Sequence, residues 1–120
     1  MTAFDAATLR YDDRGLIPAI AQDGATGDVL MMAWMNRASI EATIAEGRVV
    51  YWSRSRGELW RKGDSSGHIQ QLTEMRIDCD RDCLLLIVDQ TGPACHTNRR
   101  SCFYTAVRDD EEVEIMGVES

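Results

Sequence analysis

The chain has 120 residues, a formal net charge of −7 and 44% hydrophobic residues. This length fits one domain that a second subunit can complete, so we expect a dimer. The negative charge argues against a general nucleic-acid binder, and no apolar run reaches the roughly 20 residues that span a bilayer. The N-terminus does not resemble a signal peptide, which predicts a cytoplasmic protein without a membrane partner. In that reducing compartment the four cysteines are expected to be ligands, nucleophiles or core residues rather than disulfides.

Two apolar runs separated by turn residues open the chain. Residues 15–21 predict a strand, and Pro18 restricts it to a sheet edge or a strand start. Residues 29–35 predict a second strand, and the glycines and aspartates of 23–28 supply the turn between the two. This pattern predicts a β-hairpin.

A helix is predicted from the N-cap residue Asn36 through Glu46, with Gly47 as its C-terminal stop. One face of this helix is expected to carry Ile40, Thr43 and Ile44. The β-formers of 49–53 then predict another strand.

A polar region punctuated by glycines follows, at 57–67, and the pattern predicts a loop-rich segment around Leu59 and Trp60. Further on, residues 72–79 and the apolar run 84–88 predict two strands, the second fully buried.

Residues 103–107 are expected to close the core, and the acidic tail at about 109–120 to be frayed. The order of elements predicts an α+β fold, mainly β-sheet with one or two short helices, in a compact single domain spanning 1–120.

Three cysteines, Cys79, Cys95 and Cys102, are candidate zinc ligands. Fifteen residues separate the first two and six separate the last two, which is not the paired C-x2-C pattern of zinc ribbons. Three thiolates leave a fourth position open for a catalytic water. Adding Cys83 as a fourth ligand gives instead a closed structural site, although we favour Cys83 as a small core residue.

Acidic residues alternate around the first cysteine, at Asp78, Asp80 and Asp82. In an extended segment their carboxylates would share one side while Cys79 faces the other, so one strand could serve zinc and a harder cation such as magnesium. An EF-hand loop is excluded, because Cys83 stands where that loop needs glycine and an apolar run follows. A solvated acidic turn is the remaining alternative.

His96 and His68 are the candidate catalytic residues, because a histidine can exchange a proton near neutral pH. His96 directly follows Cys95 and is a general acid, a general base or a zinc ligand. His68 either contacts substrate or orders the Ser-Ser-Gly-His loop that contains it.

A basic island within the acidic chain predicts a small phosphorylated ligand. Residues 48–62 hold five basic residues against the single acid Glu58. Arginine forks and serine hydroxyls hold phosphate oxygens, and a tryptophan stacks on a base. A solvated basic face is the alternative. The substrate-binding candidates are Trp52, Ser53, Arg54, Ser55, Arg56, Lys62, Ser66 and Arg99.

Ordered motifs from about Arg14 to Val107 resemble the phosphoribosyl-AMP cyclohydrolase family of histidine biosynthesis. The resemblance departs from the family pattern at Asp64, Asn98 and Cys83. The matching stretches are GLIPAIAQD at 15–23, YWSRSR at 51–56, LWRKG at 59–63, SGH at 66–68, DCDRD at 78–82, GPACHT at 92–97 and SCF at 101–103.

The resemblance implies a hydrolase that opens the adenine ring of phosphoribosyl-AMP between N1 and C6. It also implies zinc on Cys79, Cys95 and Cys102, with Cys79 meeting the other two across the interface of an intertwined homodimer. Magnesium is implied on the three aspartates. On this basis we expect a zinc-bound water, deprotonated with the help of His96, to attack C6.

Two other functions would leave a different pattern in the sequence. Nucleobase deaminases attack the same carbon of adenine, but the chain lacks their H-x-E and P-C-x-x-C pattern. A non-catalytic module stabilised by a closed four-cysteine zinc site is the rival from another class, and it depends on Cys83.

Overall fold

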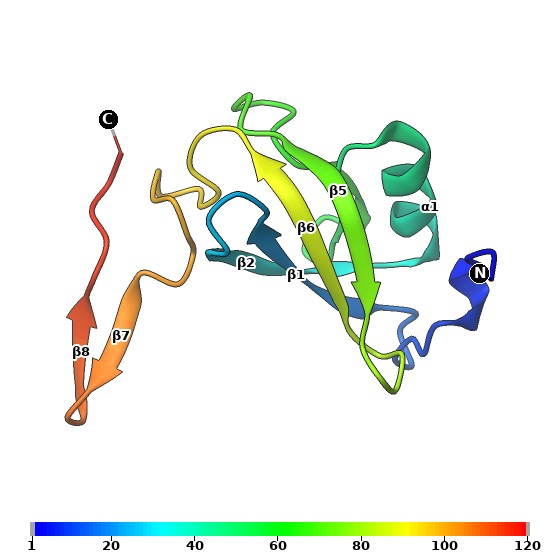
Figure 1. Cartoon of the computed structure of the whole chain (residues 1–120), viewed down its shortest axis with the longest axis horizontal. Helices are drawn as coiled ribbons and strands as arrows, with labels where there is room; N and C mark the ends of the chain where they lie inside the picture. Colours follow the sequence, from blue (N-terminus) through cyan, green and yellow to red (C-terminus); the bar gives the residue numbers. More distant parts are fainter. Residues whose placement is uncertain (1, 120) are drawn as a thin grey trace.

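The computed structural model describes residues 2–119. Its main sheet has four strands in the order β2-β1-β6-β5 (Figure 1). The strands are β1 (Ile17–Asp23), β2 (Val29–Met35), β5 (Gln70–Ile77) and β6 (Leu84–Gln90). β1 and β6 are parallel, and the two outer pairs are antiparallel.

The predicted hairpin of β1 and β2 is confirmed. β1 is a central strand, so the sheet-edge interpretation of Pro18 is wrong and the strand-start interpretation holds. The pairing of β1 with β6 begins only at Ala19, so Pro18, which has no amide hydrogen to donate, lies outside that ladder.

The helix α1 (Arg37–Glu46) begins and ends as predicted. Asn36 Oδ1 accepts a hydrogen bond from the amide of Ser39 at 2.8 Å, and Ser39 Oγ accepts one from the amide of Asn36 at 2.9 Å. Ile40 and Thr43 are buried, whereas Ile44 is 49% exposed, so the buried face of the helix is narrower than predicted.

A second hairpin joins β3 (Val50–Ser53) and β4 (Glu58–Arg61), so the prediction of a loop around Leu59 and Trp60 is wrong. Trp60 pairs with Tyr51, and their rings lie 5.5 Å apart. Gly57 ends the turn between these strands, whereas Gly63 and Gly67 lie in the loop between β4 and β5, where the predicted loop is confirmed.

The core lies between the main sheet and a layer formed by α1, the short 3₁₀ helix η1 (Ala6–Thr8) and Tyr51 of β3. Leu84, Leu86 and Val88 of β6 are buried, whereas the residues between them are only half-buried. One face of β6 is therefore fully buried, not the whole run as expected. The predicted α+β domain, mainly β-sheet, is confirmed.

The C-terminal hairpin of β7 (Thr105–Arg108) and β8 (Glu111–Glu114) extends away from the main sheet (Figure 1). Phe103 is 54% and Val107 74% exposed, so the expectation that this segment closes the core is wrong. An apolar strand pattern indicates a surface to be covered but does not identify what covers it. Within residues 2–119 no helix is long and apolar enough to cross a membrane.

Candidate active site

A pocket of about 440 Å³ brings together residues from four of the sequence motifs, those at 51–56, 59–63, 66–68 and 92–97. Both histidine candidates, His68 and His96, line it together with Cys95. Three of the substrate-binding candidates also line it, namely Arg56, Lys62 and Ser66. Proton-transfer groups, a thiol and basic side chains therefore share one cavity, which is the arrangement expected of an active site.

The loop 94–102 brings Cys95 and Cys102 together. It closes on itself where the amide of Cys95 donates to Arg99 O at 3.0 Å, and Asn98 at its tip has φ 62°. Asparagine tolerates this left-handed conformation, which is why the departure from the family pattern at this position is accommodated. The amide of Cys102 donates to Leu30 O at 2.7 Å, which fixes the loop on β2.

The two thiols influence each other. Burial acts to raise the pKa of Cys95, but hydrogen bonds from Thr97, whose Oγ1 lies 3.0 Å from the sulfur, and from Cys102 outweigh it, so that pKa lies below the usual value. Burial of the sulfur and the neighbouring Cys95 raise the pKa of Cys102 to about 11. One thiol that ionises readily beside a second thiol is a donor pair that suits zinc.

Arg100 ties the same loop to the β1–β2 turn. Its guanidinium lies 3.0 Å from Asp28 Oδ2 and 3.2 Å from Oδ2 of the buried Asp23. Thr26 donates two hydrogen bonds to Asp23, from its amide and its hydroxyl. Burial acts to raise the pKa of Asp23, but these hydrogen bonds and the Arg100 charge hold it below 3.8.

Asp23→Asn is therefore expected to lower the free energy of unfolding by about 2 kcal/mol at neutral pH. A carboxylate whose pKa is depressed in the folded state contributes its stability above the unfolded pKa of about 4 and loses it as the pH falls through the folded pKa. Urea denaturation should show a gap between variant and wild type that closes below about pH 4. Asp89→Asn, at an exposed carboxylate of β6, is the control. A gap that persists at low pH would contradict the ionic role of Asp23.

Lys62 is only 7% exposed, and its Nζ donates to Ala94 O at 2.6 Å. Burial lowers the pKa of this ammonium, and the charges of Cys102 and Cys95 act against that effect. The side chain therefore points at the backbone of the cysteine loop.

His68 rests against the backbone of Gly92. A Cβ atom at position 92 would lie 2.6 Å from Cδ2 of the imidazole, which is closer than atoms can approach. The amide of His68 donates to Ser66 Oγ at 3.1 Å. Sequence reasoning found His68 and Ser66 but not Gly92, whose only signal was its place in the GPACHT motif.

Four more substrate-binding candidates, Trp52, Ser53, Arg54 and Ser55, line a second pocket of about 590 Å³. Trp60 lines both pockets and so connects them. Two residues that sequence reasoning missed, Arg14 and Trp34, also line the second pocket, and the Arg54 guanidinium lies 4.8 Å from the Trp34 ring centroid.

Arg99 lines neither of these two pockets. Its guanidinium donates to Met116 O at 3.0 Å, pairs with Glu114 and lies 4.1 Å from the Tyr104 ring centroid. These contacts attach the C-terminal segment to the cysteine loop.

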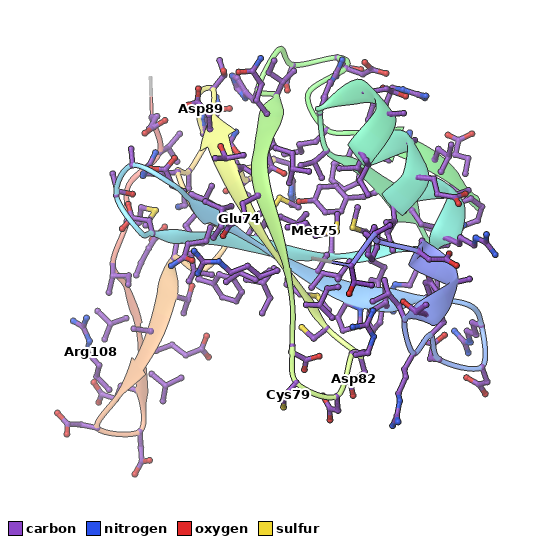
Figure 2. All side chains as sticks on the ribbon, turned by 45° about the vertical axis from the view of Figure 1, so that its right-hand side comes forward. Glu74, Met75, Cys79, Asp82, Asp89 and Arg108 are labelled. Carbon is purple, nitrogen blue, oxygen red and sulfur yellow. The ribbon has the colours of Figure 1, made fainter. Side chains whose placement is uncertain are left out.

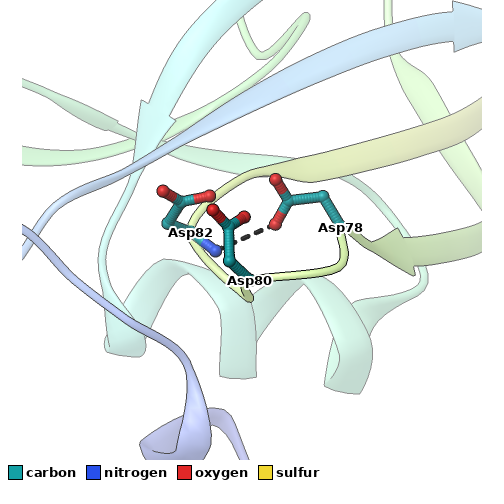
Figure 3. A group of neighbouring side chains, drawn as sticks. All are labelled: Asp78, Asp80 and Asp82. Atoms are coloured by element: carbon teal, nitrogen blue, oxygen red, sulfur yellow. Dashed lines mark hydrogen bonds between the residues drawn. The ribbon is translucent and has the colours of Figure 1, made fainter.

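The three aspartates cluster in the turn between β5 and β6, and one carboxylate oxygen from each lies within 4.8 Å of the others (Figure 3). The expected extended segment is wrong, because the chain turns here and Arg81 has φ 65°. Asp78 Oδ1 accepts hydrogen bonds from the amides of Asp82 and Cys83. The turn, rather than strand alternation, gathers the oxygens.

The pKa values of Asp78 and Asp82 shift in opposite directions. Burial acts to raise the pKa of Asp78, but hydrogen bonds led by the Asp82 amide lower it overall. Hydrogen bonding to Asp80 and Asp78 raises the pKa of Asp82. Clustered carboxylate oxygens that disfavour one another's charge suit a hard divalent cation.

Cys79 lies in the same exposed turn, at the opposite end of β6 from Asp89 (Figure 2). Cys95 follows the far end of β6, whose seven residues span about 20 Å. The structure therefore brings Cys95 and Cys102 together but not Cys79 of the same chain. Cys83 is half-buried in the Cys79 turn and is equally remote from that pair.

Two histidines, the Cys95 thiol and basic side chains in one cavity define a hydrolase-type site for a small anionic substrate. The phosphoribosyl-AMP cyclohydrolase family model matches residues 31–104. The chain belongs to this family and is an enzyme of that type.

Relatives named phosphoribosyl-AMP cyclohydrolase are similar over nearly the whole chain. The protein of Dinoroseobacter shibae is 71% identical over 94% of this chain and 95% of its own length. That of Ruegeria pomeroyi is 70% identical over the same shares. That of Jannaschia sp. is 66% identical over 99% of this chain and 100% of its own.

Proposed function

We propose that this chain hydrolyses phosphoribosyl-AMP by opening its adenine ring between N1 and C6, a step of histidine biosynthesis. The observation that carries the proposal is the convergence of His68, His96 and Cys95 on one pocket of a chain that belongs to this family. All four cysteines are free, which suits the reducing cytoplasm as the place of this reaction.

Zinc would be held by Cys95 and Cys102, and the three aspartates of the β5–β6 turn would hold magnesium. The adjacent thiols supply soft donors and the clustered carboxylates supply hard ones. With a position left open, zinc supplies an acidified water at neutral pH.

A homodimer would supply the third thiolate, because Cys79 of the same chain lies at the wrong end of β6. A second copy can bring its own β5–β6 turn to the Cys95 loop. The C-terminal segment supports this assembly, because it exposes apolar side chains near that loop and reaches away from the sheet (Figure 1). These side chains are Phe103, Val107, Val113, Ile115 and Val118.

The side chains of this pocket have distinct tasks in the reaction. Water adds to C6, its oxygen becomes that of a carboxamide, and the C6–N1 bond breaks as N1 takes up a proton. His96, exposed at the pocket, accepts the proton of the water. His68, held against Gly92, lies in the same pocket to donate the proton to N1.

The substrate carries two phosphoribosyl groups, and the two pockets that share Trp60 accommodate one each. Arg56 and Ser66 contact the group in the first pocket. Arg54, Ser53, Ser55 and Trp52 contact the group in the second.

The test follows the ultraviolet spectrum of phosphoribosyl-AMP mixed with the zinc- and magnesium-loaded protein. We expect a spectral change that depends on the enzyme and stops after chelation. An unchanged spectrum with an intact, metal-loaded protein would contradict the proposal.

Cys83→Ala separates this function from a zinc-stabilised binding module. We expect the variant to retain its zinc and its turnover, because Cys83 is half-buried beside the aspartate turn and does not lie with Cys95 and Cys102. Zinc per chain and turnover are the measurements. Release of zinc by this variant would indicate a closed four-thiolate structural site.

A further inference from the structure

Lys62 is a buried cation that has no carboxylate partner within residues 2–119. It follows β4 directly, and its Nζ donates to Ala94 O at 2.6 Å and lies 5.4 Å from the Trp60 ring centroid. Within residues 2–119, arginines make all of the ion pairs with carboxylates at 4.0 Å or less, and Lys62 makes none. An ammonium has three protons to donate, so one carbonyl does not satisfy it.

A buried ammonium is unfavourable unless opposite charge lies nearby. The ammonium ends beside Ala94, directly before Cys95, so the thiolates of a zinc site on Cys95 and Cys102 are placed to supply that charge. Three thiolates around a divalent zinc leave one net negative charge, which a single ammonium offsets.

The backbone of Lys62 is held by hydrogen bonds to Arg48 and Val49. Its amide donates to Val49 O at 3.2 Å, and its carbonyl accepts from Arg48 Nη2 at 3.0 Å. Val49 is fully buried, so this end belongs to the rigid core. The side chain then spans from the core to Ala94, the residue that precedes Cys95.

We propose that Lys62 is a positioning residue for the zinc site, which anchors the cysteine loop through Ala94 O and offsets the negative charge of the zinc–thiolate centre. This inference rests on the proposed function, in which Cys95 and Cys102 bind zinc. It replaces the expectation that Lys62 binds substrate, because a side chain only 7% exposed offers the pocket little of its charge.

Three variants separate charge from hydrogen bonding. Lys62→Arg keeps the charge, Lys62→Gln keeps a donor for Ala94 O without charge, and Lys62→Met keeps neither. The rate of zinc release to a chromophoric chelator and the thiolate-to-cobalt absorption of the cobalt-substituted dimer are the readouts. Arg61→Met is the control, because this neighbouring arginine pairs with Glu46 at the surface.

We expect zinc release from Lys62→Met to be about 10- to 100-fold faster than from wild type, as for other outer-shell partners of metal ligands. The rate of zinc release from Lys62→Gln should lie between those of Lys62→Met and wild type. The rate for Lys62→Arg should be closest to wild type, and that for Arg61→Met should equal it. The cobalt band should shift in the neutral variants and be retained in Lys62→Arg.

If Lys62→Met releases zinc at the wild-type rate and has a raised KM, the inference is wrong and Lys62 binds substrate instead. Should Lys62→Met fail to fold, equal release rates in Lys62→Gln and Lys62→Arg would overturn the role of the charge. A wild-type protein without a thiolate-to-cobalt band would overturn the proposed zinc site itself, which is a separate failure.

Discussion

Two inactive variants, Cys79→Ser and Cys102→Ser, are expected to regain activity when their chains are unfolded together and refolded as a mixture. Each variant alone should lose zinc and turnover, because every site lacks one thiolate. In a mixed dimer one site combines the intact Cys79 of one chain with the intact Cys95 and Cys102 of the other. Random pairing should give about a quarter of wild-type activity.

A second mixture is the matched control. Cys95→Ser and Cys102→Ser disrupt the same half of the site, so each of the two sites in their mixed dimer lacks a thiolate and activity should stay absent. Zinc per chain, measured on mixed dimers isolated with two different affinity tags, gives the same comparison without substrate. Absence of recovery in the first mixture, with mixed dimers demonstrated, would contradict the shared site. Retained zinc in Cys79→Ser alone would remove Cys79 from the ligands.

Local signals in the sequence predicted the elements whose geometry is itself local. Asn36 and Gly47 define the ends of α1 because a cap depends on the backbone groups of the adjacent turn. The β1–β2 hairpin was predictable for the same reason. Trp60 was misassigned because its polar, glycine-rich surroundings hide a strand that is stabilised by pairing with Tyr51.

The candidate site was predicted as a set of residues but not as an arrangement. Cys95 and His96 are adjacent in the sequence, so their proximity was certain. The gathering of the aspartates needed a turn that includes a left-handed Arg81, and residue spacing alone favoured a strand. Lys62 lies in the basic island of the sequence, and only the tertiary structure directs its ammonium to Ala94.

Gly92 illustrates a requirement that arises wholly from tertiary structure, because its neighbour His68 is distant in the sequence. Gly92 has φ 68°, and its missing side chain leaves the space that the imidazole occupies. Gly63 approaches the backbone of the same segment, since a Cβ there would lie 2.5 Å from the amide nitrogen of Ile69. The two glycines together fix where His68 points.

Gly92→Ala is therefore expected to lower kcat by about 100-fold or more, because the new methyl group displaces a histidine that donates a proton in the proposed reaction. Zinc per chain should be unchanged, which distinguishes this loss from damage to the cysteine loop. Gly15→Ala is the matched control: Gly15 has φ 76° with open space around it, so that variant has the left-handed strain of about 1–2 kcal/mol without a clash. In the double variant Gly92→Ala/His68→Ala the clash is absent, so its free energy of unfolding should exceed that of Gly92→Ala alone. A Gly92→Ala enzyme with wild-type kcat would show that the position of His68 does not control the chemistry.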